Sequence, residues 1–106
     1  MITKDKVFII TGASSGIGSE LAYQLTLKGA SVVCAARTIT KLETLCKNIN
    51  NNGGTALPIQ ADITKKDQCE KIVTQTIKRF SRIDGLILNA GISMWAKFDE
   101  IKDVSF

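Results

Sequence analysis

A glycine-rich turn at residues 11–18, T-G-A-S-S-G-I-G, separates a short apolar run from a segment with helical periodicity. The preceding run at 7–10 is β-rich and ends at Thr11. Ile17, Leu21 and Leu25 then recur every four residues and predict one face of an α-helix, which Gly29 would end. The next run, 31–36, is apolar on both alternating faces, as in a strand covered on both sides. The order strand, turn, helix, strand predicts a βαβ unit.

The same alternation continues as far as residue 88. Thr40 and Glu43 form a capping-box pair before a second predicted helix, which the N-N-N-G-G run at 50–54 ends. Residues 55–60 predict a third strand, and Thr64 with Asp67 is expected to cap a long third helix. A turn at 84–85 leads to a fourth strand at 86–88. The apolar stripes of the second and third helices are Leu42, Leu45, Cys46 and Ile49, then Cys69, Ile72, Val73, Thr76, Ile77 and Phe80.

Four strands that alternate with three helices predict an α/β fold, a three-layer Rossmann-type doubly wound parallel sheet. Pro58 cannot donate a ladder hydrogen bond, so the third strand is expected at an edge and the strand order is 3-2-1-4. The fourth strand is apolar and uncharged, and an open edge there would invite pairing with another chain. No further strand-like run follows it, so we expect residues 1–106 to be the N-terminal part of one incomplete, apparently truncated domain.

The chain contains no histidine, which excludes the common zinc ligand sets and every Ser-His or Cys-His nucleophile. Cys34, Cys46 and Cys69 form no C-x-x-C pair, and their odd number argues against a disulfide framework. We therefore expect buried, reduced thiols in a reducing compartment, and no metal site.

The net charge of +4 raises the possibility of an anionic macromolecular partner. The densest lysines, Lys65 and Lys66, are however interleaved with Asp67 and Glu70, as on a solvated helix face. We expect no nucleic-acid partner, although a basic nucleic-acid binder stays an alternative. No signal peptide and no apolar run of about 18 residues is present, so we expect a cytoplasmic protein without a membrane segment.

The position of the glycine turn between a strand and a helix suggests phosphate binding. Glycines permit positive φ angles and a close approach of main-chain N–H groups to a pyrophosphate, and the helix N-terminus adds its positive dipole end. Ser14 and Ser15 would add hydroxyl donors, and Ser15 also suits the N-cap position. The alternative is a turn that is merely tight. A Walker-type loop is excluded because no Lys followed by Ser or Thr comes after the last glycine.

The spacing G-x-x-x-G-x-G resembles that of the classical short-chain dehydrogenase/reductase family. Arg37, Asp62 with Ile63, and the N-A-G run at 89–91 match further motifs, so the resemblance covers nearly the whole chain and is closest to hydroxysteroid-dehydrogenase-like reductases. It implies an oxidoreductase acting on a small alcohol or carbonyl, and a homo-oligomer when complete. The cofactor-binding residues that it implies are Gly12, Ser14, Ser15, Gly16, Ile17, Gly18, Arg37, Asp62, Ile63, Asn89, Ala90 and Gly91.

By this resemblance, the residues of the glycine turn line the pyrophosphate and the adjoining ribose. Asp62 accepts a hydrogen bond from the adenine amino group, the Ile63 main chain meets the ring edge, and residues 89–91 support the sheet centre and touch the ribose on the nicotinamide side. An NAD site would carry an acid at the end of the second strand, where this chain has Ala36 followed by Arg37. A guanidinium matches a phosphate bidentately, which favours NADP(H) over NAD(H), and Thr38 could add a hydroxyl.

The acid/base residues of the family, a Ser and a Tyr-x-x-x-Lys pair, have no match in the chain. Tyr23 lies in the first predicted helix with Leu27 four residues later, so its expected role is packing. Ser93 follows the fourth strand too closely to be the family's serine, and Met94, Trp95 and Phe98 are expected to form a covered apolar patch. We name no catalytic residue and expect this chain alone to be inactive. A non-catalytic dinucleotide-binding or interaction module is the alternative function.

Overall fold

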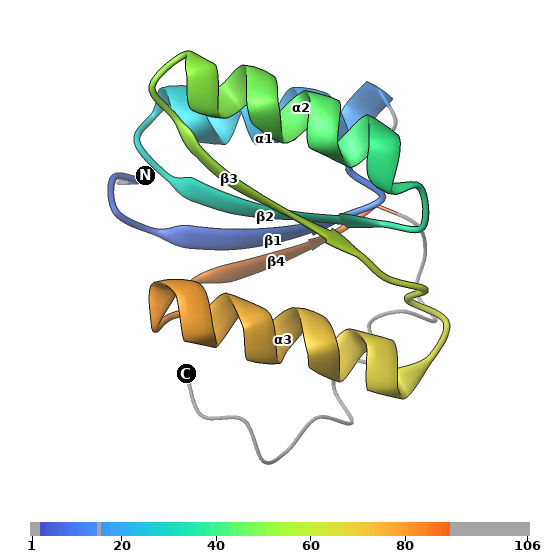
Figure 1. Ribbon diagram of the computed structural model, residues 1–106. Helices are drawn as coiled ribbons and strands as arrows, with labels where there is room; N and C mark the ends of the chain where they lie inside the picture. The colour runs from blue at the N-terminus through green and yellow to red at the C-terminus, as the bar shows by residue number, and fades with distance from the viewer. Residues whose placement is uncertain (1–2, 15, 90–106) are drawn as a thin grey trace.

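Strands and helices alternate along the part of the chain that the computed structural model describes, residues 3–14 and 16–89. The predicted strands at 31–36 and 55–60 are confirmed to the residue, and β4 begins one residue earlier than predicted. The elements, labelled in Figure 1, are β1 (Val7–Thr11), α1 (Gly16–Leu27), β2 (Ser31–Ala36), α2 (Ile39–Asn51), β3 (Thr55–Gln60), α3 (Lys66–Phe80) and β4 (Gly85–Leu88).

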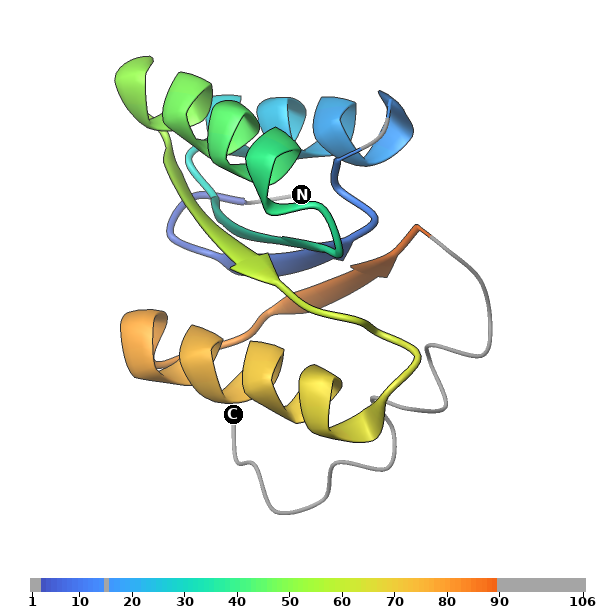
Figure 2. The same cartoon turned by 45° about the vertical axis from the view of Figure 1, so that its right-hand side comes forward.

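The four strands form one parallel sheet in the order β3-β2-β1-β4, as predicted. Helices α1 and α2 cover one face and α3 covers the other, which gives the three layers seen in Figures 1 and 2. Pro58 lies on β3, at an edge of the sheet, opposite Cys34 of β2. The missing N–H of the proline therefore costs no hydrogen bond to a second neighbouring strand.

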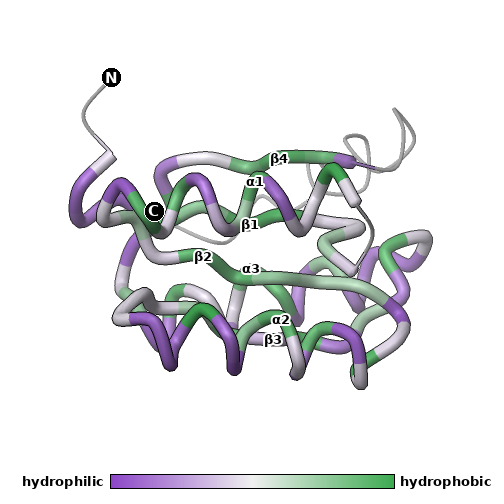
Figure 3. The backbone as a smooth tube through the Cα atoms, turned by 90° about the horizontal axis from the view of Figure 1, so that it is seen from above, coloured by the Kyte–Doolittle hydropathy of each residue, from purple (hydrophilic) through white to green (hydrophobic). Residues whose placement is uncertain are grey.

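Alternate residues of the central strands enter two separate cores. Ile10 and Cys34 pack with residues of α1 and α2, whereas Ile9 and Val33 pack with residues of α3. This alternation follows from the two-residue period of a strand, and it explains why β1 and β2 are apolar on both faces. In Figure 3 β1, β2 and β4 are mostly green, while the helices alternate between green and purple along their length.

Helix α1 packs against the sheet through small residues. Gly18 and Ala22 are its buried residues, and Leu21 and Leu25 are only partly buried beside them. Ile17 is 72% exposed, so the prediction that it belongs to the apolar face was wrong. Gly18 lies so close to main-chain atoms of Gly12 and Ala13, in the turn after β1, that only a hydrogen atom fits at this position.

The first turns of α2 and α3 differ from the predicted capping boxes. Helix α2 begins at Ile39, and Thr40 lies inside it with its carbonyl accepting a hydrogen bond from the Thr44 hydroxyl. Helix α3 begins at Lys66. Its N-cap residue is Lys65, so Thr64 lies one residue too early to cap the helix, and the Thr64 hydroxyl donates to Oδ1 of Asp62 at 2.6 Å in the preceding turn. Both capping-box predictions were therefore wrong, although both helices exist.

The buried side chains agree with the sequence in two further respects. Cys34, Cys46 and Cys69 are free and buried, as predicted. A hydrogen bond to Cys46 raises the pKa of the Cys34 thiol, and burial raises it further. The Cys34 thiol therefore stays protonated and unreactive at neutral pH. Tyr23 packs against the core beneath α1, the role expected for it. Within the described residues, no helix combines the length and apolarity that crossing a bilayer requires.

Candidate functional site

The carboxyl ends of β1, β2 and β4 lie side by side at one edge of the sheet. Thr11 at the end of β1 pairs with Ala35 of β2 on one side and with Leu88 of β4 on the other. From β1 the chain proceeds outward to β2 and β3, and then returns to the other side of β1 as β4. In open α/β sheets, ligands bind outside the carboxyl ends of the strands at such a reversal of strand order.

The turn between β1 and α1 is held against β2. Gly12 has a φ of +67°, a left-handed conformation that glycine adopts without strain. Its N–H and that of Ala13 both donate to the carbonyl oxygen of Ala35, at 2.9 and 3.4 Å. Helix α1 begins four residues after this turn glycine, at Gly16. By helix geometry its first N–H groups have no acceptor inside the helix, and they carry the positive end of the dipole.

Gly18 and Gly16 have opposite surroundings. A Cβ atom on Gly18 would lie 2.6 Å from the carbonyl oxygen of Gly12 and 2.8 Å from the Cα atom of Ala13. A Cβ atom on Gly16 would have no atom within 4 Å. Gly18 therefore lets α1 start in direct contact with the turn, and Gly16 leaves open space beside the helix N-terminus. Open space beside the first N–H groups of a helix is what an anionic group such as a pyrophosphate requires, so these residues fit it.

Asn89 and Thr11 join the ends of β4 and β1. The Asn89 side-chain amide donates to the carbonyl oxygen of Gly12 at 3.3 Å, and the Asn89 N–H donates to the Thr11 hydroxyl at 3.3 Å. That hydroxyl donates in turn to the carbonyl oxygen of Ile87 at 3.4 Å. Asn89 therefore links the end of β4 to the end of β1 and to the turn that follows it. Ser15, Ala90 and Gly91, which were also predicted site residues, lie outside the described residues.

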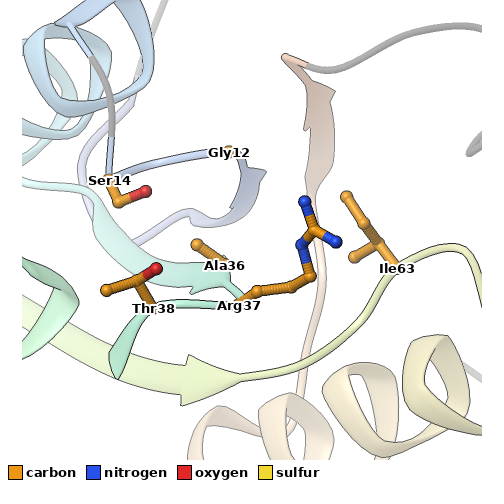
Figure 4. Close-up of a pocket in the computed structure, with 6 residues that line it drawn as sticks. All are labelled: Gly12, Ser14, Ala36, Arg37, Thr38 and Ile63. Atoms are coloured by element: carbon orange, nitrogen blue, oxygen red, sulfur yellow. The ribbon is translucent and has the colours of Figure 1, made fainter. Parts of the chain in front are cut away.

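A hollow of about 240 Å³ opens beside the turn (Figure 4). Complete small-molecule pockets measure about 300–1,000 Å³, so this hollow would hold one part of a dinucleotide. Figure 4 shows the Arg37 side chain extending from the end of β2 toward Ile63. The residues that line the hollow are Gly12, Ser14, Ala36, Arg37, Thr38 and Ile63.

Asp62 lies in the turn between β3 and α3, next to this hollow. Its Oδ1 atom accepts hydrogen bonds from the Thr64 hydroxyl at 2.6 Å and from the Thr64 N–H at 3.0 Å. The Thr64 hydroxyl and then the Thr64 N–H lower the pKa of Asp62, and the positive charges of Lys65 and Arg37 act in the same direction. The carboxylate is therefore ionised at neutral pH and retains lone pairs for a further donor.

Gln60 was not among the predicted site residues, yet its side-chain amide donates to the Arg37 carbonyl oxygen at 2.9 Å. Its place beside Arg37 depends on the register between β2 and β3, which the sequence alone does not give. Together the site offers N–H donors for one anion at the start of α1 and a guanidinium for a second anion at the end of β2. Gly12 and Ser14 of the turn before α1 line the same hollow as Arg37, so one ligand with two phosphate positions could contact both.

Comparison with known proteins places this chain in a family. The family model described as short chain dehydrogenase matches residues 6–106. An uncharacterized oxidoreductase of Listeria monocytogenes is 43% identical over 103 residues, which are 97% of this chain and 42% of that protein. The 11-beta-hydroxysteroid dehydrogenase A of Sesamum indicum is 41% identical over 101 residues, 94% of this chain and 29% of that protein. The chain thus spans less than half the length of these curated relatives.

Solved structures give the same result for the fold. A hydroxysteroid dehydrogenase from Escherichia coli superposes with a TM-score of 0.81 at 32% identity, over 85% of this chain and 38% of that one. A metagenomic short-chain oxidoreductase, solved in complex with NADP, superposes with a TM-score of 0.80 at 34% identity, over 87% of this chain and 42% of that one.

Proposed function

Since this chain belongs to the short chain dehydrogenase family, we propose that it is the NADP(H)-binding part of an oxidoreductase that interconverts an alcohol and a carbonyl. The nicotinamide of such a cofactor supplies the hydride chemistry when bound, and the protein supplies binding and orientation. Small-molecule substrates and oligomers are usual in this family, and we propose both for the complete protein. The hydroxysteroid dehydrogenases among the relatives support a steroid-like alcohol or carbonyl as the substrate class.

The start of α1 would hold the pyrophosphate. Gly12, Ser14, Gly16, Ile17 and Gly18 would surround it, together with Ser15. The open space at Gly16 and the contact of Gly18 with the turn support this assignment. The exposed position of Ile17, which leaves it outside the core, is also consistent with contact to a ligand.

Arg37 carries the proposed preference for NADP(H). It follows Ala36 at the carboxyl end of β2, where an NAD-binding site would have a carboxylate, and both residues line the hollow. A guanidinium can bind a 2′-phosphate through two parallel, charge-assisted hydrogen bonds. Its interaction with an uncharged 2′-hydroxyl is much weaker. The NADP bound in a related structure supports the same cofactor.

The other ends of the cofactor would lie on either side of β1. Asp62, whose carboxylate is ionised, would accept a hydrogen bond from the adenine amino group, and Ile63 would contact the ring edge through its main chain. Asn89, Ala90 and Gly91 would support the end of β4 and contact the ribose next to the nicotinamide. The hydrogen bonds from Asn89 to Gly12 and Thr11 support this role.

Calorimetric titration of the purified protein with NADP⁺ and with NAD⁺ tests the proposal. Charge-assisted hydrogen bonds contribute about 1.5–3 kcal/mol, so we expect NADP⁺ to bind at least about tenfold more tightly than NAD⁺. Arg37→Ala should remove this preference and leave the affinity for NAD⁺ nearly unchanged. Lys47→Ala, which removes the same charge from the exposed face of α2, should change neither affinity. Absence of binding to both dinucleotides would refute the function, and an unchanged preference in Arg37→Ala would refute the role of Arg37.

A further inference from the structure

Arg37 is exposed, and its long side chain has many rotamers. Holding it at one phosphate costs conformational entropy. A contact that fixes the main chain of Arg37 restricts the directions in which the Arg37 side chain can extend. Such a contact would increase the affinity for a phosphate without touching the phosphate.

Gln60 makes a contact of this kind. It is the last residue of β3 and pairs with Ala36 in the ladder between β2 and β3. The Ala36 carbonyl oxygen accepts a hydrogen bond from the Ala61 N–H at 3.0 Å, and the next carbonyl oxygen, that of Arg37, accepts from Nε2 of Gln60 at 2.9 Å. The glutamine side chain therefore continues the ladder by one hydrogen bond, at the residue where β2 leaves the sheet.

Gln60 is itself held from the opposite layer of the fold. Nζ of Lys71, in α3, donates to the Gln60 main-chain carbonyl oxygen at 2.7 Å. The main chain of Gln60 is thus hydrogen-bonded to α3, and its side chain to the turn that carries Arg37. Gln60 does not line the hollow, so a bound ligand would meet Arg37 and not this side chain.

We propose that Gln60 is a positioning residue for cofactor selection, which holds the Arg37 main chain so that the guanidinium extends into the hollow seen in Figure 4. This inference rests on the proposed function, because it concerns the same 2′-phosphate. It predicts a loss of affinity confined to ligands that carry this phosphate. A general role in folding would instead weaken the binding of every ligand of the site.

The test compares two probes that differ by a single group, 2′-phospho-ADP-ribose and ADP-ribose, in calorimetric titrations. Gln60→Met keeps the length of the side chain and removes its donor. Loss of one hydrogen bond corresponds to about a three- to tenfold weaker affinity, and we expect this for 2′-phospho-ADP-ribose only. Gln75→Met, at an exposed glutamine of α3, is the matched control and should change neither affinity.

A double-mutant cycle with Arg37→Ala completes the test. If Gln60 acts through Arg37, Gln60→Met should have no further effect in the Arg37→Ala background. Equal weakening of both probes, or an effect that persists without Arg37, would overturn the positioning role while leaving the function in place. A wild-type protein that binds both probes equally, and is indifferent to Arg37→Ala, would instead overturn the cofactor assignment itself. Unfolding midpoints of all variants show whether each protein is folded.

Discussion

The side-chain amide of Asn89 donates a hydrogen bond of 3.3 Å to the main-chain carbonyl oxygen of Gly12, across 77 residues of sequence. The same amide nitrogen would lie 3.0 Å from a Cβ atom on Gly18. The end of β4, the turn after β1 and the start of α1 therefore pack against one another with no space between them. A change in any one of these segments must be transmitted to the other two, because packed interiors yield little.

Gly18→Ala should destabilise the protein although alanine is the better helix former. The new methyl group would meet the Gly12 carbonyl oxygen at 2.6 Å and the Ala13 Cα atom at 2.8 Å, and both are main-chain atoms that cannot rotate away. Overpacking of this kind costs about 1–3 kcal/mol. The free energy of unfolding, measured by urea denaturation, should fall by this amount.

Gly16→Ala is the control for this change, since its methyl group would enter open space. Alanine is favoured over glycine in a helix by up to about 1 kcal/mol, so this variant should be as stable as the wild type or slightly more stable. Equal stability of the two variants would show that the close approach of α1 to the turn is not tight.

Thr11→Val should be more costly than the same substitution at Thr76, although both threonines are fully buried. The Thr11 hydroxyl links two segments by accepting from the Asn89 N–H and donating to the Ile87 carbonyl oxygen. Its loss leaves a part-buried N–H without this acceptor, at a cost of about 1–3 kcal/mol. The Thr76 hydroxyl donates to Ile72, a carbonyl of its own helix. We therefore expect Thr76→Val to cost less than about 1 kcal/mol, and similar unfolding free energies for both would contradict this account.

The element order and the strand order follow from the sequence because each depends on a repeated signal. The run at 31–36 is apolar throughout, and Leu42, Leu45, Cys46 and Ile49 recur with helical spacing and are all buried. Pro58 predicts that β3 lies at an edge, because proline has no N–H group to donate to a second neighbouring strand. Each of these signals comes from one residue or from repeated positions within one segment, so a single sequence is enough to detect it.

The helix caps and the orientation of α1 were not predictable in the same way. Thr64 satisfies a capping-box pattern, yet α3 begins at Lys66 with Lys65 as its N-cap, so Thr64 lies one residue too early to cap it. Ile17 satisfies an apolar period, yet the buried face of α1 is set by how closely Gly18 approaches Gly12. The position of Gln60 beside Arg37 likewise depends on the register between β2 and β3. Each of these features depends on distances between segments, which the sequence alone does not contain.

Arg37→Asp should shift the cofactor preference toward NAD⁺. A carboxylate at the end of β2 can accept hydrogen bonds from ribose hydroxyls and repels a 2′-phosphate. We expect the affinity for NADP⁺ to fall more than about tenfold and the affinity for NAD⁺ to stay equal or to increase, measured by calorimetry. Lys47→Asp makes the same change of charge on α2 and should leave the ratio of the two affinities unaltered. The same ratio in Arg37→Asp and the wild type would remove the 2′-phosphate from this part of the site.

Asp84 should make the stability depend on pH in the acid range. Its carboxylate accepts two hydrogen bonds from Arg82, at 2.8 and 2.7 Å, and one from the Val7 N–H at 2.8 Å, which ties the chain before β4 to the start of β1. Arg82 first, and then the Val7 N–H, lower the pKa of Asp84 below its usual range.

A carboxyl group with a lowered pKa in the folded state stabilises the protein above its unfolded pKa of about 3.9, and this stabilisation is lost as the pH falls through the folded value. Asp84→Asn should therefore reduce the free energy of unfolding at pH 6, and the difference from the wild type should shrink below about pH 4. Urea denaturation between these pH values measures it, with Glu43→Gln on the exposed face of α2 as the matched control. A difference between Asp84→Asn and the wild type that stays constant across this range would mean that the stabilisation does not depend on the charge of Asp84.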